Sequence, residues 1–176
     1  MKRLIAFIVV ILFIFPISIQ AQEELSEHLA PLKPFTGKTW KGIFSGKDND
    51  KMTRDVSRWE RALNGQAIRI MHSVDDGVYG GESIVMWDPV KESLVFFYFT
   101  TAGFFTNGTI KFEDGQFISH EYVTGEKSGI TEVIGTGKML PDGRYLSKSK
   151  YLQNGKWVEG HEIYYVEDPE AKVILK

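Results

Sequence analysis

Short turn signals recur along this chain, and they constrain its fold more than any other feature. Asn-Gly and Asp-Gly pairs tolerate the positive φ angles that tight hairpin turns require. Runs rich in Val, Ile, Thr, Tyr, Phe and Trp lie between the signals, and this is the composition of β-strands. The signals are Leu63-Asn64-Gly65, Asp75-Asp76-Gly77, Asp88-Pro89, Glu113-Asp114-Gly115, Pro141-Asp142-Gly143 and Asn154-Gly155. The sequence therefore predicts a series of β-hairpins.

About ten strands fit between these turns. Connections this short make neighbouring strands antiparallel, because a parallel return needs a dozen or more residues. Closing the series into a barrel removes the two exposed edges that an open sheet would leave. We therefore expect an all-β fold, a single up-and-down antiparallel barrel, with a two-sheet Greek-key sandwich as the alternative. The expected strands lie near residues 38–45, 53–62, 66–74, 79–87, 93–101, 104–113, 116–123, 129–139, 144–152 and 156–166.

The N-terminal segment has a different pattern. Two basic residues at positions 2 and 3 precede an apolar run that ends at Phe15, and small and polar residues follow up to Ala21. This order is typical of a secretory signal peptide, residues 1–21, with cleavage after Ala21. A retained membrane anchor is the alternative, although the run is shorter than the ~20 residues that a spanning helix needs. We expect a periplasmic or secreted protein whose lipocalin-like barrel domain covers residues 22–176.

One short helix is expected directly after the signal peptide. Leu25, Leu29 and Leu32 recur at the spacing of one helical face, and Pro31 and Pro34 predict the end of the helix. A helix of this length is not stable alone. We therefore expect it to bury its leucines over one end of the barrel.

The composition excludes several classes of protein. The 176 residues include no cysteine, which excludes disulfides, thiolate nucleophiles, zinc fingers and iron–sulfur clusters. The formal net charge of −2 is not that of a strongly basic nucleic-acid-binding protein, so no nucleic-acid partner is expected. After residue 21 no segment is long and apolar enough to span a membrane, and no membrane association is expected after signal cleavage.

Familiar catalytic motifs are absent from the sequence. It contains neither a phosphate-binding Gly-x-x-x-x-Gly-Lys-Ser/Thr loop nor a Gly-x-Ser-x-Gly elbow. His120-Glu121 and His161-Glu162 lack the second histidine of a zinc-protease motif, and adjacent residues of a strand point to opposite faces. We therefore expect no metal and no cofactor, and we assign no catalytic residue.

Alternation along the expected strands separates lumen-facing from outward-facing side chains. The strand at 93–101 is apolar on both faces, which predicts cover from outside by the N-terminal segment or by a second subunit of a homo-oligomer. The faces expected to line the lumen are Ile68, Ile70, His72 and Val74; Ile118, His120 and Tyr122; Tyr145, Ser147, Ser149 and Tyr151; and Trp157, His161, Ile163 and Tyr165.

Aromatic and aliphatic walls with a few hydroxyls and imidazoles are typical of small-molecule pockets. Burial would keep His72 neutral, with one hydrogen-bond donor and one acceptor for a ligand. Glu82 and Glu132 are the candidate lumenal carboxylates. Packing in the core is the alternative role for the aromatic residues, and a single structural hydrogen bond is the alternative for the histidines. The predicted ligand-binding residues are Trp59, His72, Tyr98, His120, Tyr122, Tyr145, Ser149, Tyr151 and His161.

A series of short motifs carries a family resemblance. The segment 32–42 contains Gly37 and Trp40, and four further motifs follow in order: Trp59 to Leu63-Asn64-Gly65, Trp87-Asp88-Pro89, Thr101-Ala102-Gly103 and Gly108-Thr109. Over residues 30–167 the chain resembles the calycin-like barrels, which include lipocalins, fatty-acid-binding proteins and nitrobindin-type domains, and in particular small bacterial secreted domains of unassigned function. The opening Gly-x-x-Trp is one residue longer than the Gly-x-Trp of lipocalins.

The resemblance implies a barrel and leaves the ligand open. The Arg-x-Tyr pair that holds a fatty-acid carboxylate in the family has no counterpart, and the surroundings of His161 differ from those of the nitrobindin haem ligand. We expect a barrel that binds an apolar or amphipathic molecule without catalysis. One alternative is a lyase or isomerase that uses a lumenal carboxylate or histidine with a tyrosine, and a close Glu–His or Glu–Tyr pair in a void would favour it. The other is a structural or interaction module with a filled barrel.

Overall fold

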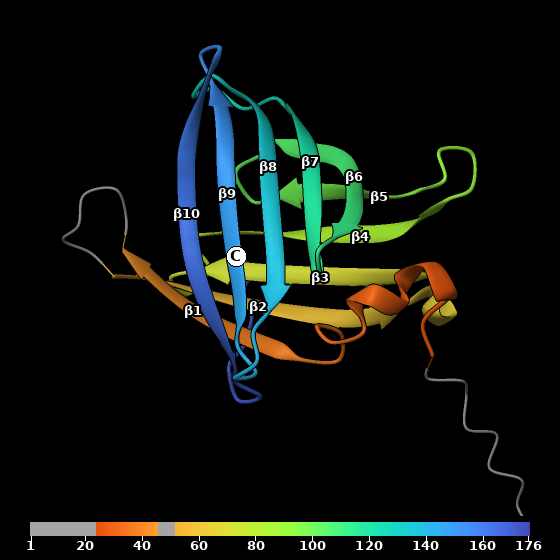
Figure 1. Ribbon diagram of the computed structural model, residues 1–176. Coiled ribbons are helices and arrows are strands. Elements are labelled where there is room, and N and C mark those ends of the chain that lie inside the picture. Colours follow the sequence, from red (N-terminus) through yellow and green to blue (C-terminus); the bar gives the residue numbers. More distant parts are fainter. Residues whose placement is uncertain (1–23, 46–51) are drawn as a thin grey trace, which may run out of the picture.

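A computed structural model describes residues 24–45 and 52–176, which form a closed all-β barrel (Figure 1). Each strand pairs in antiparallel fashion with its sequence neighbours, and β1 closes the ring against β10. The predicted up-and-down barrel is confirmed, and it is compatible with a calycin-like fold. The strands are β1 (Thr39–Ser45), β2 (Met52–Ala62), β3 (Ala67–Val74), β4 (Tyr79–Asp88), β5 (Ser93–Thr100), β6 (Phe105–Glu113), β7 (Gln116–Thr124), β8 (Ile130–Met139), β9 (Tyr145–Gln153) and β10 (Lys156–Glu167).

The predicted turns supply the backbone geometry that the hairpins need. Asp76, Asp114 and Asn154 have φ angles of 58°, 50° and 51°, in the left-handed region that Asn and Asp tolerate best after glycine. The predicted signal peptide, residues 1–21, lies outside the described residues. None of the helices that the structure describes is long and apolar enough to cross a membrane.

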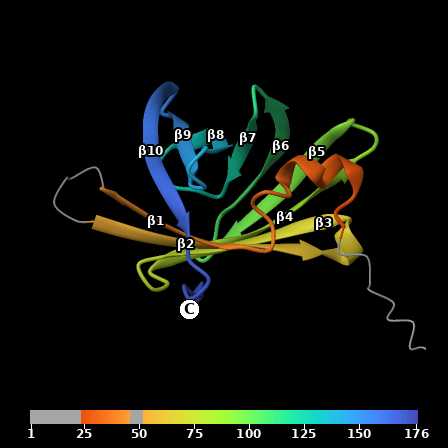
Figure 2. The same ribbon diagram turned by 60° about the horizontal axis from the view of Figure 1, so that its bottom comes forward.

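The N-terminal segment covers one end of the barrel (Figure 2). It forms a 3₁₀ helix, η1 (Glu27–Leu32), whose Leu29 and Leu32 are fully buried. His28 stacks on Trp87 of β4 with ring centroids 3.8 Å apart, which fixes the helix to the wall. The helix ends at Leu32, before Pro34, as predicted, but Pro31 lies inside the helix and does not end it. In so short a helix most N–H groups lack an intrahelical partner in any case, so a proline costs little.

A dense apolar core fills the half of the barrel next to η1, which we call the closed half. Trp40 is fully buried and donates its indole N–H to the Phe35 carbonyl oxygen at 3.1 Å. Tyr145 packs edge-on against both of these rings, at 5.2 Å from Trp40 and 5.5 Å from Phe35. The buried core residues are Leu29, Leu32, Phe35, Trp40, Trp59, Ile68, Val85, Leu94, Phe96, Ile110, Tyr145, Ile163 and Tyr165. The opposite half, which we call the cavity half, is built differently.

The outer face of β5 is apolar, as its sequence indicates. Phe97 and Phe99 stack with ring centroids 6.3 Å apart, and they are 47% and 54% exposed. Contact of this strand with a second subunit stays a prediction. The chain after β10 packs on another part of the outer surface, where the backbone N–H of Ile174 donates to Ser73 Oγ of β3 at 2.9 Å.

Candidate functional site

The cavity half contains a solvent-open cavity of about 610 Å³. This volume lies within the range of small-molecule pockets, about 300–1,000 Å³. Its wall combines aromatic rings, aliphatic side chains and hydroxyls with a small number of ionisable groups. The lining includes Asp55, Ser57, Trp59, Ile70, His72, Tyr79, Phe96, Tyr98, Phe104, Thr106, Phe117, Ser119, Glu121, Tyr145, Ser149, Tyr151, His161 and Tyr165. We regard this cavity as the candidate functional site.

Most of the predicted ligand-binding residues meet in this cavity. They come from strands on both sides of the barrel, and the structure brings them together by closing the ring. Trp59 and Tyr145 sit at the base of the cavity and also belong to the core of the closed half, so the two roles are not exclusive. The predicted residues that line the cavity are Trp59, His72, Tyr98, Tyr145, Ser149, Tyr151 and His161.

His120 and Tyr122 lie on the outside of the barrel, contrary to expectation. His120 Nε2 contacts the carboxylate of Glu132 at 2.6 Å, and Tyr122 is 53% exposed. The opposite face of β7 lines the cavity instead, through Ser119 and Glu121 together with Phe117. Both faces of this strand mix apolar and polar residues, so alternation alone could not show which one points inward.

An irregularity in the pairing of β10 with β9 explains why the predicted facing of Trp157 is wrong. The pairing with β9 shifts between Glu159 and Glu162, so two residues of β10 lie opposite Ser149. This bulge reverses the alternation, which turns Trp157 outward, where it is 46% exposed, while His161 lines the cavity. The expectation that Trp157 shares a face with His161 is therefore wrong.

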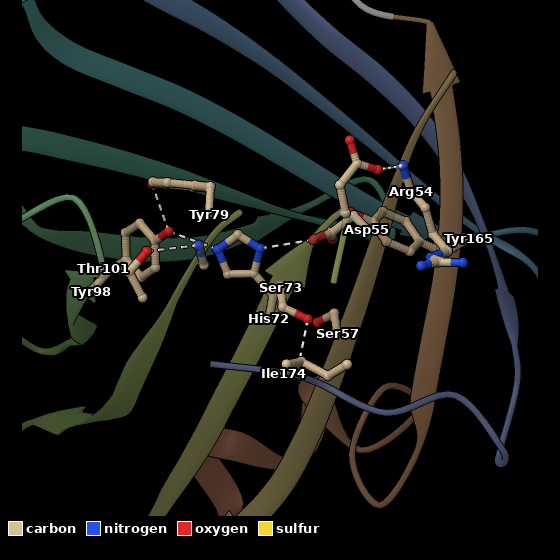
Figure 3. A network of polar contacts seen from close by, with 12 residues as sticks. Arg54, Asp55, Ser57, His72, Ser73, Tyr79, Tyr98, Thr101, Tyr165 and Ile174 are labelled. Carbon is tan, nitrogen blue, oxygen red and sulfur yellow. Dashed lines mark hydrogen bonds and ion pairs between the residues drawn. The ribbon is translucent and has the colours of Figure 1, made fainter. Parts of the chain in front are cut away.

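The main polar feature of the cavity is a chain of hydrogen bonds from Asp55 to Tyr79 (Figure 3). His72 lies at its centre, with Nδ1 2.9 Å from Asp55 Oδ1 and Nε2 2.7 Å from the Tyr98 hydroxyl. The Tyr98 hydroxyl lies 2.8 Å from that of Tyr79. On the far side, the Tyr165 hydroxyl donates to Asp55 Oδ2 at 2.6 Å. Asp55 is only 4% exposed, and both of its oxygens accept hydrogen bonds.

The direction of this chain follows from the acceptor at its end. An ionised carboxylate can only accept, so His72 Nδ1 carries a proton and donates to Asp55. With a neutral imidazole, Nε2 is then an acceptor, and Tyr98 donates to it. Tyr79 in turn donates to Tyr98. In this arrangement the hydroxyls of Tyr98 and Tyr79 donate along the chain toward Asp55, and their oxygens keep lone pairs for the cavity.

Strand register and a glycine make this arrangement possible. His72 of β3 pairs with Ser57 of β2 on one side and with Gly81 of β4 on the other. A Cβ atom at Gly81 would collide with the ring of Tyr98 and with the backbone of Phe99. Glycine at this position therefore lets the Tyr98 ring lie across β4 and reach His72.

A second polar cluster lies at the bulge of β10. His161 Nδ1 is 2.9 Å from the Tyr151 hydroxyl and 3.1 Å from Ser149 Oγ, which also accepts the backbone N–H of His161 at 3.1 Å. A Cβ atom at Gly160 would collide with Ser149 Oγ and with the Tyr151 ring, so the bulge requires glycine there. Burial lowers the pKa of His161, which favours its neutral form.

Glu121 is a further ionisable group of the cavity, and it comes from the face of β7 that was not predicted. Thr106 Oγ1 donates to it at 2.8 Å and Ser119 Oγ at 3.5 Å. Burial raises the pKa of Glu121, so the site favours its protonated form. The predicted carboxylates lie elsewhere: Glu82 forms a two-point ion pair with Arg69, and Glu132 contacts His120 on the outside.

The sequence reasoning missed Asp55, Tyr79, Glu121 and Tyr165 as polar or ionisable groups of the site. Asp55 could have been found, because Asp55, Ser57 and Trp59 alternate along one strand and Trp59 was a candidate. Tyr165 was assigned to the correct face but not to a hydrogen bond. Tyr79 stands at the first position of β4, where alternation gives the least guidance.

Burial raises the pKa of the phenols of Tyr79, Tyr98 and Tyr151, so these groups act as neutral hydroxyls in the site. In the described part of the chain, no three His, Asp or Glu side chains are placed to hold a metal ion together. The sequence matches no model of a known protein family and none of the curated proteins. The function must therefore be argued from the cavity itself.

Proposed function

We propose that this protein is an exported, calycin-like barrel that binds a small amphipathic molecule in its cavity. The observation that carries the proposal is the open cavity of about 610 Å³, with rings at its base and the Asp55–His72–Tyr98–Tyr79 chain along its side. A barrel with a purely structural role would fill this space with side chains, because protein interiors pack at high density. Apolar walls with a few oriented polar groups suit a ligand that has one apolar and one polar part.

Native mass spectrometry of the protein purified from its own host tests this proposal directly. We expect a co-purifying molecule whose mass remains on the intact barrel and is lost on unfolding. Trp59 lines the cavity, so binding of the recovered molecule should also change the tryptophan fluorescence. A barrel that carries no molecule and binds no amphipathic compound would contradict the proposal.

The binding residues can be tested with two matched substitutions. Tyr98→Phe removes one hydroxyl from the cavity, and Tyr122→Phe removes one from the outer surface, where Tyr122 is 53% exposed. We expect the first change to weaken binding about tenfold, the scale of one well-placed hydrogen bond, and the second to have no effect. Equal affinities of the two variants would show that the polar chain does not contact the ligand.

The same chain favours acid–base catalysis on the bound molecule as a second candidate function. A carboxylate, an imidazole and a hydroxyl in sequence can relay a proton to or from a substrate. The test is to incubate the recovered ligand with the protein in D₂O and to measure carbon-bound deuterium by mass spectrometry. Exchange that is fast with the wild type and slow with Tyr98→Phe would support catalysis, and its absence would leave binding as the function.

A further inference from the structure

The cavity is lined by carboxyl and basic groups, and the basic groups in its described lining are His72, His161 and Lys148. Its wall includes three carboxyl groups, those of Asp55, Glu121 and Glu126. No arginine is found in the lining that the structure describes, and the ammonium group of Lys148 is held by Glu162 at 2.8 Å in a solvent-exposed ion pair. A buried anionic group would therefore find no cation inside, and an unpaired buried charge is strongly unfavourable.

The two histidines of the cavity do not add a positive charge that a ligand could contact. Burial lowers the pKa of His161 and favours its uncharged form. His72 donates from Nδ1 to Asp55, so even a protonated His72 would be neutralised by the carboxylate that it already contacts. Among the described lining residues, no positive group other than the ion-paired Lys148 is thus left for a ligand.

Aromatic rings surround the same polar region. Tyr79 stacks on Phe104 with ring centroids 6.5 Å apart, and His72 lies 5.8 Å from the Tyr79 ring and 5.5 Å from the Tyr98 ring. The faces of Tyr and Phe rings attract cations, most strongly where water is excluded. The hydroxyl oxygens of Tyr98 and Tyr79, 2.8 Å apart, add lone pairs to this surface.

A bound cation would change the protonation state of Glu121. Its partners are two hydroxyls, and it forms no ion pair with any of the residues that the structure describes. Tyr98 is linked to both carboxyl groups: its hydroxyl lies 2.7 Å from His72 Nε2, whose Nδ1 contacts Asp55. Tyr98 also pairs across β5 and β6 with Thr106, whose hydroxyl donates to Glu121 at 2.8 Å. A positive group beside Tyr98 would interact with both.

We propose that the ligand of this cavity is an amphipathic organic cation, a protonated or quaternary amine on an apolar body. Its amine lies beside Tyr98, between Asp55 and Glu121, and its apolar body lies against Trp59 and Phe117 at the base. This inference rests on the proposed function and names the ligand class for the same site.

The affinity of the cavity for a cation should depend on pH through Glu121. Glu121 favours its protonated form in the empty barrel because of burial, and a bound cation stabilises the ionised form. Binding of the cation therefore releases protons, and the affinity rises with pH. The other titratable groups around Glu121 are Tyr79, Tyr98 and Tyr151, which remain neutral, the carboxylate of Glu126 and the outward-facing His120.

Three probes built on an eight-carbon chain separate the ligand classes: octyltrimethylammonium, octan-1-ol and octanoate, each titrated by calorimetry into the protein. We expect the cation to bind at least ~10-fold more tightly than the alcohol, and octanoate to bind most weakly. Titrations in two buffers with different ionisation enthalpies should show proton release for the cation alone.

Two variants with matched chemistry complete the experiment. Glu121→Gln keeps the shape of the side chain but should abolish proton release and reduce the preference for the cation, whereas Glu132→Gln on the outside should change neither. Equal binding of cation and alcohol, or tighter binding of octanoate, would overturn this proposal and leave the proposed function intact. If none of the three probes binds, this proposal fails, and native mass spectrometry of the host-purified protein then decides the proposed function separately.

Discussion

The two halves of the barrel are made of the same strands but serve opposite purposes. In the closed half, Leu29, Leu32 and Trp40 are fully buried, and rings pack edge to face with no space between them. In the cavity half, strands of the same barrel carry Asp55, His72 and Glu121 around an open cavity. Burial of apolar surface stabilises a fold, and burial of ionisable groups opposes folding. The apolar packing of the closed half therefore stabilises the fold, and the buried ionisable groups of the cavity half destabilise it.

This division explains why a chain without disulfides can hold an interior cavity. The polar groups of the cavity half are arranged in hydrogen-bonded sets, with Asp55 contacted by His72 and Tyr165, and Glu121 by hydroxyls. Such sets limit the cost of burial without removing it. Substitutions in the two halves should consequently differ in the size of their effects on stability, and removal of a buried carboxyl group should differ in sign as well.

The largest effect is expected in the closed half. Trp40→Ala removes a fully buried ring and the indole hydrogen bond to the Phe35 carbonyl, so the free energy of unfolding should fall by about 3–5 kcal/mol. Urea denaturation followed by circular dichroism measures this change. Trp157→Ala is the control, because Trp157 is 46% exposed, and it should shift the free energy by no more than about 0.5 kcal/mol. Similar losses from both changes would mean that the closed half is not the main source of stability.

The second largest loss of stability is expected at the β10 bulge, where the packing of the cavity half requires a glycine. Gly160→Ala forces a Cβ atom against Ser149 and Tyr151, and overpacking of this kind costs about 1–3 kcal/mol. The His161 cluster should be displaced, which ¹H–¹⁵N spectra of the imidazole would report. Gly143→Ala is the control, because its Cβ meets nothing within 4 Å, and its strain comes only from a φ of +86°. An unchanged imidazole spectrum in Gly160→Ala would contradict the role of the bulge.

A smaller effect is expected in the polar chain. Tyr98→Phe removes the hydroxyl that joins His72 to Tyr79, and the free energy of unfolding should fall by about 1–2 kcal/mol, since water in the cavity can replace part of the contact. Urea denaturation of this variant beside Trp40→Ala compares the two halves directly. A loss as large as that of Trp40→Ala would show that the chain is a main structural element rather than a feature of the site.

Much of the fold could be predicted from the sequence, because turn residues and alternation act locally. Residues such as Asp76 and Asn154 fix the hairpins through their own backbone preferences, and ten consecutive hairpin strands have few ways to avoid open edges. The leucines of η1 likewise indicate a buried face before the barrel is seen.

The site was less predictable, because it depends on which face of each strand points inward. A strand with mixed residues on both faces, such as β7, is oriented by its neighbours, so Glu121 was missed and His120 was assigned inward. A single extra residue in β10 reverses the alternation between Trp157 and His161. Hydrogen bonds such as Asp55–His72 depend on pairing between strands, and no single strand pattern contains them.

The smallest effect is expected from Glu121, and its sign is the reverse of the others. Burial raises the pKa of Glu121 in the folded state, so above about pH 4.5, its ordinary value, the folded protein retains a proton that the unfolded chain loses. The free energy of unfolding therefore declines as the pH rises from that value toward the raised pKa. Glu121→Gln cannot ionise, so at pH 7 it should be more stable than the wild type, by about 0.5–1 kcal/mol. Thermal denaturation of both proteins between pH 4 and 8 checks this, and parallel curves would mean that the cavity half does not oppose the ionisation of its carboxyl group.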